Sequence, residues 1–156
     1  LGGQLPPFFR GQFYRFFHNP PKAAFSIKDY RFTKVYIDLD KHDPAKTLDI
    51  NFDTSGKFVK SESLFDLHFK IAVFDNGRRD DPFIKLTCEG IFQFTNVSDL
   101  SDIPEFFFTN SVALLFPYVR AYLTIITTQA NTKGIMLPTL NLSALGSILK
   151  KNTSER

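Results

Sequence analysis

Strict alternation of apolar and polar residues dominates the chain from residue 25 to about residue 95 and predicts β-strands. It is clearest over residues 65–73, where every second side chain is apolar and those between are polar or small. Asn76-Gly77 follows, a pair that tolerates the positive φ of a tight turn, and alternation resumes over residues 84–94. We therefore predict an antiparallel hairpin with one buried and one solvent-facing surface.

Two further strands are predicted before this hairpin. Alternation over residues 48–52 predicts a strand that ends near Ser55-Gly56. Residues 25–39 also alternate, but the phase slips at about Asp29 and at Thr33-Lys34. A slip of one residue turns the apolar face over unless a β-bulge absorbs it, so we predict a long first strand with two bulges.

The pattern becomes helical after a turn-rich segment at residues 96–102. The sequence predicts a long helix that is capped by Thr109 or Asn110 and runs to about Ala130. Its apolar residues point in nearly every direction, and Arg120 is its only charged side chain. Because four strands and one short helix do not enclose such a helix, we expect a second copy of the chain to cover the rest. The expected oligomer interface consists of Leu115, Phe116, Tyr118, Val119, Tyr122 and Ile126.

A shorter helix is predicted from about residue 144 to residue 151. Asn141 or Ser143 supplies its cap. Its inner face is expected to carry Leu145, Ile148 and Leu149. The tail that follows is short and polar.

The amino-acid composition adds one observation, a high content of aromatic residues. The 156 residues are 43% hydrophobic, as in one globular domain, but 19 are Phe and none is Trp. This apolar surface must be buried within the chain, buried between copies, or exposed for binding. The formal charge of +3 arises entirely within residues 1–24, because the remainder has equal numbers of acidic and basic residues. Without a basic patch on the folded body, nucleic acid is not an expected partner.

Residues 1–24 are expected to lie outside the folded domain, which we place at residues 25–156. No helical or strand period is kept there, and the plain interpretation is an irregular extension or the remnant of an expression tag. The alternative is an arm that docks on an apolar surface, because six aromatic residues surround two arginines. They are Phe8, Phe9, Arg10, Phe13, Tyr14, Arg15, Phe16 and Phe17.

The sequence offers little catalytic chemistry. Cys88 lies at an apolar strand position, where a small inert core residue is expected, and a single cysteine suits a reducing compartment. The histidines at positions 18, 42 and 68 have no spacing typical of a metal site, and no glycine-rich phosphate loop precedes a helix. We therefore expect a protein that is not an enzyme, with no catalytic residue, metal or cofactor.

The most apolar stretch, residues 112–126, is short for a membrane span and contains Pro117 and Arg120. The first residues form no unbroken apolar stretch of signal-peptide length. We therefore expect a soluble, cytoplasmic protein without stable membrane insertion.

Apolar residues gather at the two junctions of the long helix and form a candidate binding surface. Each alone is best interpreted as core, but together they exceed what a domain of this size needs to bury. An exposed apolar groove binds extended or unfolded segments without sequence specificity. The candidate groove residues from this argument are Phe94, Phe106, Phe107 and Leu140.

Three motifs resemble the SecB export-chaperone family. The most recognisable helical stretch of that family is similar to residues 115–121, LFPYVRA. Its Gly-Ile-Phe element matches Gly90-Ile91-Phe92, and its entry into the final helix, Val-Asn-Phe-Asp-Ala-Leu, resembles residues 140–145, LNLSAL. The order and spacing of the motifs agree from about residue 25 to residue 149.

The resemblance implies an α+β fold in which a four-stranded antiparallel sheet is followed by one long and one short helix. It implies a homotetramer, a dimer of dimers with the long helices at its centre. It also implies an ATP-independent holdase that keeps preproteins unaggregated and export-competent in apolar grooves. On the matching positions, the groove residues are Phe92, Leu142 and Leu145.

Two departures from the family pattern bear on the partners. Familiar members are acidic and bind the SecA translocase motor through an acidic sheet surface and the C-terminal tail. Here the body is neutral, and Val35 and Tyr36 stand where acidic residues are expected. This argues against coupling to SecA and favours, as an alternative, a solitary SecB-like chaperone that controls a toxin–antitoxin pair by binding the antitoxin. A structural oligomer without clients is a further alternative.

Overall fold

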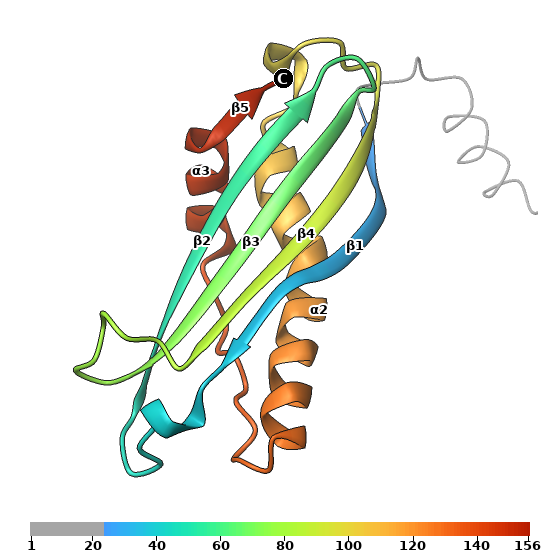
Figure 1. Cartoon of the computed structure of the whole chain (residues 1–156). Coiled ribbons are helices and arrows are strands. Elements are labelled where there is room, and N and C mark those ends of the chain that lie inside the picture. The colour runs from blue at the N-terminus through green and yellow to red at the C-terminus, as the bar shows by residue number, and fades with distance from the viewer. Residues whose placement is uncertain (1–23) are drawn as a thin grey trace, which may run out of the picture.

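The computed structural model describes residues 24–156, and Figure 1 shows a twisted sheet with two helices on one face. The long strands are β1 (Ala24–Ile37), β2 (Leu48–Val59), β3 (Leu64–Asp75) and β4 (Ile84–Thr95). They are followed by helices α2 (Phe106–Gln129) and α3 (Leu142–Lys151) and a short strand, β5 (Thr153–Glu155). Two 3-10 turns are η1 (Leu39–Lys41) and η2 (Leu100–Asp102). The predicted α+β fold is confirmed; the aromatic segment at residues 8–17 lies outside the described residues.

The strand order is β1-β4-β3-β2-β5, and the four long strands pair antiparallel with their neighbours. The register of β1 against β4 shifts between Ile27 and Asp29 and again between Phe32 and Lys34, which confirms the two predicted bulges. The β3–β4 hairpin is confirmed as well, with Gly77 at a φ of 88° in its loop. Residues 38–47, which we name the crossover connection, carry the chain across one end of the sheet from β1 to β2.

The sheet has five strands, so the expectation of four was wrong. β5 runs parallel to β2 and pairs with Gly56–Phe58, and the Arg156 N–H donates to the Phe58 carbonyl at 2.8 Å. The tail has no alternation of apolar residues, and its pairing depends only on backbone groups. It becomes a strand because α3 delivers it to the edge of β2.

Strand β2 also extends beyond its predicted end at Ser55-Gly56 and reaches Val59. Gly56 is not a turn residue: it lies inside the strand, where a Cβ would overlap the Phe65 ring of β3. A glycine at this position lets the aromatic ring cover the strand.

Both helices begin earlier than predicted. α2 starts at Phe106, ahead of the caps expected at Thr109 or Asn110, because Phe107 and Phe108 turn inward onto the sheet. α3 starts at Leu142, and the Asn141 side chain accepts the Ala144 N–H at 3.1 Å, which confirms Asn141 as its cap. Of the three residues expected on its inner face, Leu145 and Leu149 are buried, whereas Ile148 is 37% exposed and its placement was wrong.

The core lies between the inner face of the sheet and the inner faces of α2 and α3. Phe107 is its centre at the start of α2, with its ring edge-on to Phe25 at 4.8 Å and to Phe65 at 4.7 Å. Farther along, α2 approaches β4 closely because Gly90 has no side chain; a Cβ there would lie 2.7 Å from Leu115 Cδ1. Many of the phenylalanines therefore pack within the core of a single chain.

Candidate functional site

The structure divides the predicted groove residues into buried and accessible ones. Four of them lie in the core of their own chain and line no open surface. They are Phe92, Phe94, Phe107 and Leu145. Phe106 is 53% exposed, and Leu140 and Leu142 are half-buried. These seven residues therefore do not form one continuous groove.

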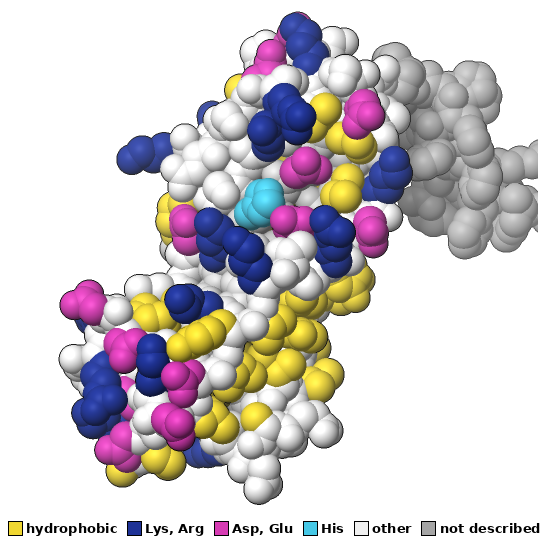
Figure 2. All heavy atoms as spheres, in the orientation of Figure 1, with side chains coloured by type: hydrophobic (Ala, Val, Ile, Leu, Met, Phe, Trp, Pro, Cys, Tyr) yellow, Lys and Arg dark blue, Asp and Glu magenta, His cyan; other side chains and the backbone are white. Residues whose placement is uncertain are grey.

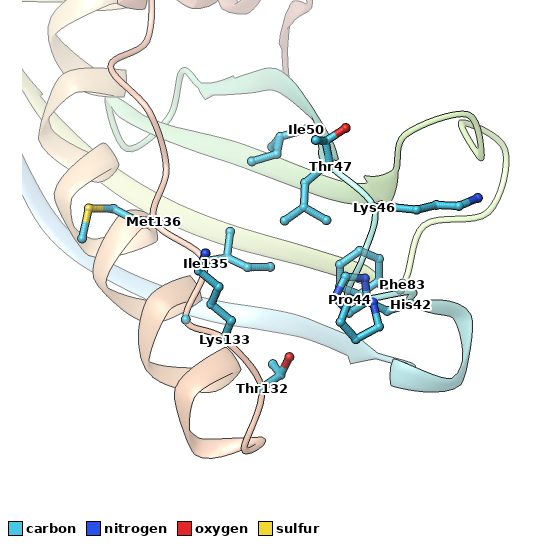
Figure 3. A pocket seen from close by; sticks show the side chains of 12 residues that line it. His42, Pro44, Lys46, Thr47, Ile50, Phe83, Thr132, Lys133, Ile135 and Met136 are labelled. Carbon is cyan, nitrogen blue, oxygen red and sulfur yellow. The ribbon is translucent and has the colours of Figure 1, made fainter.

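An apolar groove of about 470 Å³ lies at the opposite end of the sheet (Figure 3). One wall is the crossover connection, and the other is the helix linker, residues 130–141, between α2 and α3. Its apolar lining consists of Leu48, Ile50, Phe83, Ile135 and Met136. Its polar lining includes His42, Lys46, Thr47, Thr132 and Lys133.

Sequence reasoning missed most of this site because its walls are irregular segments that meet only in the folded chain. In the helix linker, Ile135 and Met136 line the groove, and Met136 is 68% exposed. Leu48 and Ile50 belong to the inward face of β2, near the end of the sheet. The available signal was the apolar character of residues 48–50 and of residues 135–137, without any indication that both border the same groove.

The backbone of β2 is open on the side that adjoins the groove. Gly56 N–H donates to the Asn152 carbonyl at 3.1 Å, which shows that the backbone groups of Gly56 point away from β3. The N–H and C=O groups of successive residues point to alternate sides of a strand. Those of Leu48, Ile50 and Phe52 therefore point away from β3, as those of Gly56 do. No hydrogen bond from another described residue reaches the backbone groups of these three positions. β5 pairs only with Gly56–Phe58, at the other end of this edge.

His42 and Asp75 fix the crossover connection to the end of β3. The buried Asp75 carboxylate accepts the Asp43 N–H at 2.7 Å and contacts His42 Nδ1 at 2.6 Å. Burial by itself raises the pKa of Asp75, but these two bonds and the nearby Arg78 charge outweigh it and hold the pKa below its usual value. The His42 ring stacks on Phe83 with the centroids 4.2 Å apart, so it forms part of the groove wall.

The residues expected at an oligomer interface also divide between two faces of α2. Leu115 and Val119 are buried against the chain's own sheet, so they are not accessible to a second copy. Phe116, Tyr122 and Ile126 are half-buried, and Tyr118 is exposed. Leu115 and Val119 face inward because the helix needs one apolar stripe for its own sheet.

The outward stripe of α2 is nevertheless apolar. Leu114, Tyr118 and Ile125 are exposed along it, and Tyr118 stacks on Tyr30 of β1 at 4.1 Å. Figure 2 shows apolar side chains gathered along the edge of the molecule where α2 emerges beside β1. A second hollow of about 460 Å³ on this helix meets the groove at Met136.

The outer face of the sheet mixes acidic and basic side chains (Figure 2). Arg31 pairs with Glu89 at 3.3 Å, and His68 Nδ1 lies 3.5 Å from the other oxygen of the same carboxylate. On the next strand pair, Asp53 lies opposite Lys70. This face is not an acidic surface, in agreement with the neutral charge of the body.

The single cysteine of the chain lies in the core. Cys88 is 1% exposed, and burial raises the pKa of its thiol to about 11, so the thiolate is scarce at neutral pH. Within the same residues, no group of three or more His, Cys, Asp or Glu side chains has the arrangement of a metal site.

Helix α2 is long and apolar enough to cross a bilayer by length and composition alone. A third of its most apolar window is buried within the chain, where Val112, Leu115 and Leu123 contact the sheet side of the core. A single helix of this kind is weak evidence for a membrane span.

Known proteins share this architecture. The SecB family profile, described as preprotein translocase subunit SecB, matches residues 25–151. An uncharacterized protein of Methanocaldococcus jannaschii is 28% identical over 132 residues, which cover 81% of this chain and 84% of the relative.

Two solved structures are also similar. The Mycobacterium tuberculosis SecB-like chaperone Rv1957, in complex with a ChAD peptide from the Rv1956 HigA1 antitoxin, aligns with a TM-score of 0.56 and 15% identity. The alignment covers 75% of this chain and 91% of that protein. A protein of unknown function from Streptococcus agalactiae aligns with a TM-score of 0.43 and 11% identity over 76% of this chain and 100% of its own.

The family match spans every long strand and both helices, and the LFPYVRA stretch lies on α2 as the resemblance implied. This chain belongs to the SecB family.

Proposed function

We propose that this protein is an ATP-independent holdase of the cytoplasm that binds extended segments of unfolded polypeptides in the groove between the crossover connection and the helix linker. The observation that carries the proposal is an apolar groove beside an unpaired edge of β2. The groove accommodates apolar side chains, and the strand edge offers backbone hydrogen bonds, so the site recognises a chain that is both apolar and extended.

The geometry of β2 supports strand addition by the client. Leu48, Ile50 and Phe52 direct their N–H and C=O groups toward the open side, and the side chains of Leu48 and Ile50 line the groove. An extended segment that pairs with this edge places every second side chain over the apolar lining. Backbone pairing gives affinity without regard to sequence, as a chaperone of many clients requires.

The energetics also suit transient binding. A fully buried large apolar side chain contributes about 1.5–3 kcal/mol, so two or three of them offset part of the cost of ordering the client. Release then follows when the client folds or passes to another protein, and no catalytic step is needed.

Met136→Asp provides the test. A charge at this exposed groove residue should weaken binding of reduced, carboxymethylated α-lactalbumin about tenfold, since one apolar contact is lost and a carboxylate is desolvated. It should equally impair suppression of aggregation of reduced α-lactalbumin, measured by light scattering without ATP. Wild-type protein that neither binds nor protects the unfolded chain would contradict the proposal.

Two matched variants locate the site. Ile148→Asp introduces the same charge on α3 outside the groove lining and should leave binding unchanged. Phe106→Asp tests the predicted junction at the start of α2, where that ring is 53% exposed. If Phe106→Asp weakens binding and Met136→Asp does not, clients bind at the junction and the groove proposed here is wrong.

The client class is either exported preproteins or an antitoxin. The mixed charge of the outer sheet face gives no acidic surface for the SecA motor. The similar Mycobacterium tuberculosis chaperone was solved with an antitoxin peptide, which supports the antitoxin alternative. Crosslinking and pulldown from the native host separates the two: preproteins with signal sequences indicate export, and one dominant small antitoxin indicates toxin control.

A further inference from the structure

His42 stands out in the groove because its environment determines which ring nitrogen carries the proton. The residue follows η1 in the crossover connection, and its side chain is 13% exposed. Phe83, itself buried, covers one face of the imidazole. The accessible remainder of the ring belongs to the groove lining.

The Asp75 contact determines the role of Nδ1. One carboxylate oxygen accepts the Asp43 N–H, and the other lies 2.6 Å from Nδ1. An ionised carboxylate only accepts hydrogen bonds, so Nδ1 must carry a proton and donate it. In the neutral imidazole, Nε2 is then the nitrogen with the free lone pair.

Nε2 is both unpartnered and accessible. No described residue forms a hydrogen bond with it. Every buried side-chain nitrogen or oxygen in the described part of the chain has a hydrogen-bond partner, so an atom without one is open to solvent. The structure therefore holds a hydrogen-bond acceptor of known direction at the wall of an apolar groove.

We propose that His42 Nε2 accepts a hydrogen bond from a backbone N–H of the bound polypeptide segment, which makes His42 the polar anchor of the groove. This inference rests on the proposed function. An extended chain has N–H groups on both sides, and the edge of β2 satisfies only one side. A second acceptor is needed because burying an unpaired peptide N–H is costly. Asp75 is the positioning residue, since it sets the tautomer of His42.

The test compares His42→Asn with His42→Gln at pH 8. In His42→Asn, the side-chain amide lies at the position of Nδ1 and still donates to Asp75, but no atom replaces Nε2. In His42→Gln, the longer side chain places its amide at the position of Nε2. His42→Asn should bind reduced, carboxymethylated α-lactalbumin about 3- to 10-fold more weakly, as expected for one lost hydrogen bond. His42→Gln should recover part of the affinity. His68→Asn, on the outer face of the sheet, is the matched control and should bind like wild type.

A spectroscopic readout separates anchoring from a structural role. In ¹⁵N-labelled protein, the free His42 ring should show a protonated Nδ1 and a bare Nε2, and binding of the unfolded protein should shift the Nε2 resonance upfield while His68 stays constant. Asp75→Asn, whose amide donates to Nδ1, should reverse the tautomer and weaken binding as His42→Asn does.

An unchanged Nε2 resonance at saturation, or wild-type affinity in His42→Asn, overturns the anchor and leaves the holdase proposal intact. Absence of binding by wild-type protein overturns the holdase proposal itself. The two failures are therefore distinguishable in the same titration.

Discussion

At the end of β3, the Asp75 side chain is buried and is held by the Asp43 N–H and the His42 ring, which belong to the crossover connection. Lys41 of the same connection pairs with Asp81 at 2.6 Å in the β3–β4 loop. Exposed ion pairs such as Lys41–Asp81 contribute little to the stability of a folded protein. Removing a hydrogen-bond partner of the buried Asp75 carboxylate, in contrast, leaves a buried polar group unsatisfied and is costly. The wall of the groove is therefore held mainly by Asp75.

The hydrogen bonds of the Asp75 carboxylate make the stability of the protein depend on pH. The pKa of Asp75 is lower in the folded chain than its ordinary value of 3.8, so its stabilising contribution is complete above that value and is lost as the pH falls through the folded pKa. We expect the melting temperature of wild type to fall more steeply than that of Asp75→Asn between pH 5 and roughly pH 2. Parallel curves would show that Asp75 is not the titrating anchor.

Cys88 gives a second prediction at the scale of one residue. Its burial and its raised pKa, about 11, should make the native thiol unreactive toward iodoacetamide at pH 8, with alkylation at least about a hundredfold slower than for an exposed thiol. Mass spectrometry after timed quenching measures the rate, and protein unfolded in urea is the control. Rapid alkylation of the native chain would mean that β4 opens locally.

At the scale of elements, α3 lies close to α2 because Gly146 has no side chain. A Cβ on Gly146 would lie 2.9 Å from the backbone N and Cα of Thr109, atoms that do not yield as a flexible side chain does. Helix propensity alone favours Ala over Gly by about 1 kcal/mol, whereas overpacking typically costs about 1–3 kcal/mol. The steric effect should therefore outweigh helix propensity and make Gly146→Ala destabilising.

Gly146→Ala should lower the free energy of unfolding by about 1–2 kcal/mol, measured by urea denaturation. Ser147→Ala, at the neighbouring exposed position of α3, is the control and should change it by about 0.5 kcal/mol or less. A stabilised Gly146→Ala variant would show that α3 moves away from α2 without penalty.

At the scale of the whole molecule, the outward stripe of α2 remains uncovered. Leu114, Tyr118 and Ile125 lie on it, and Ile125 is 57% exposed. We propose that this stripe packs against a second copy, as the predicted tetramer requires. The inward residues Leu115 and Val119 do not take part, because their own sheet covers them.

Ile125→Glu should reduce the oligomeric mass, read by native mass spectrometry, because a carboxylate would be buried at the centre of an apolar contact. Ile148→Glu, an exposed apolar residue of α3, is the matched control and should leave the mass unchanged. A wild-type protein that is monomeric at all concentrations would contradict the interface. An oligomer that protects no unfolded protein would instead favour the structural alternative.

Local patterns in the sequence were enough to predict several strands and a helix cap. Alternation over residues 65–73 and 84–94 predicted the hairpin, and the phase slips at Asp29 and Thr33-Lys34 predicted the bulges, because side-chain direction in a strand follows a period of two. Asn141 was recognised as a cap because its side chain satisfies a backbone N–H only three residues away. The family motifs also lie within single elements or at their junctions.

Which apolar residues stay accessible depends on contacts between distant parts of the chain. Phe92 and Phe107 face each other across the core, with their rings 5.6 Å apart, whereas Met136 of the helix linker is 68% exposed. The groove, the contact between His42 and Asp75, and the pairing of β5 all join segments that are distant in the sequence. Local periodicity carries no information about such encounters, because they depend on where the twist of the sheet and the length of α2 bring the ends of the elements.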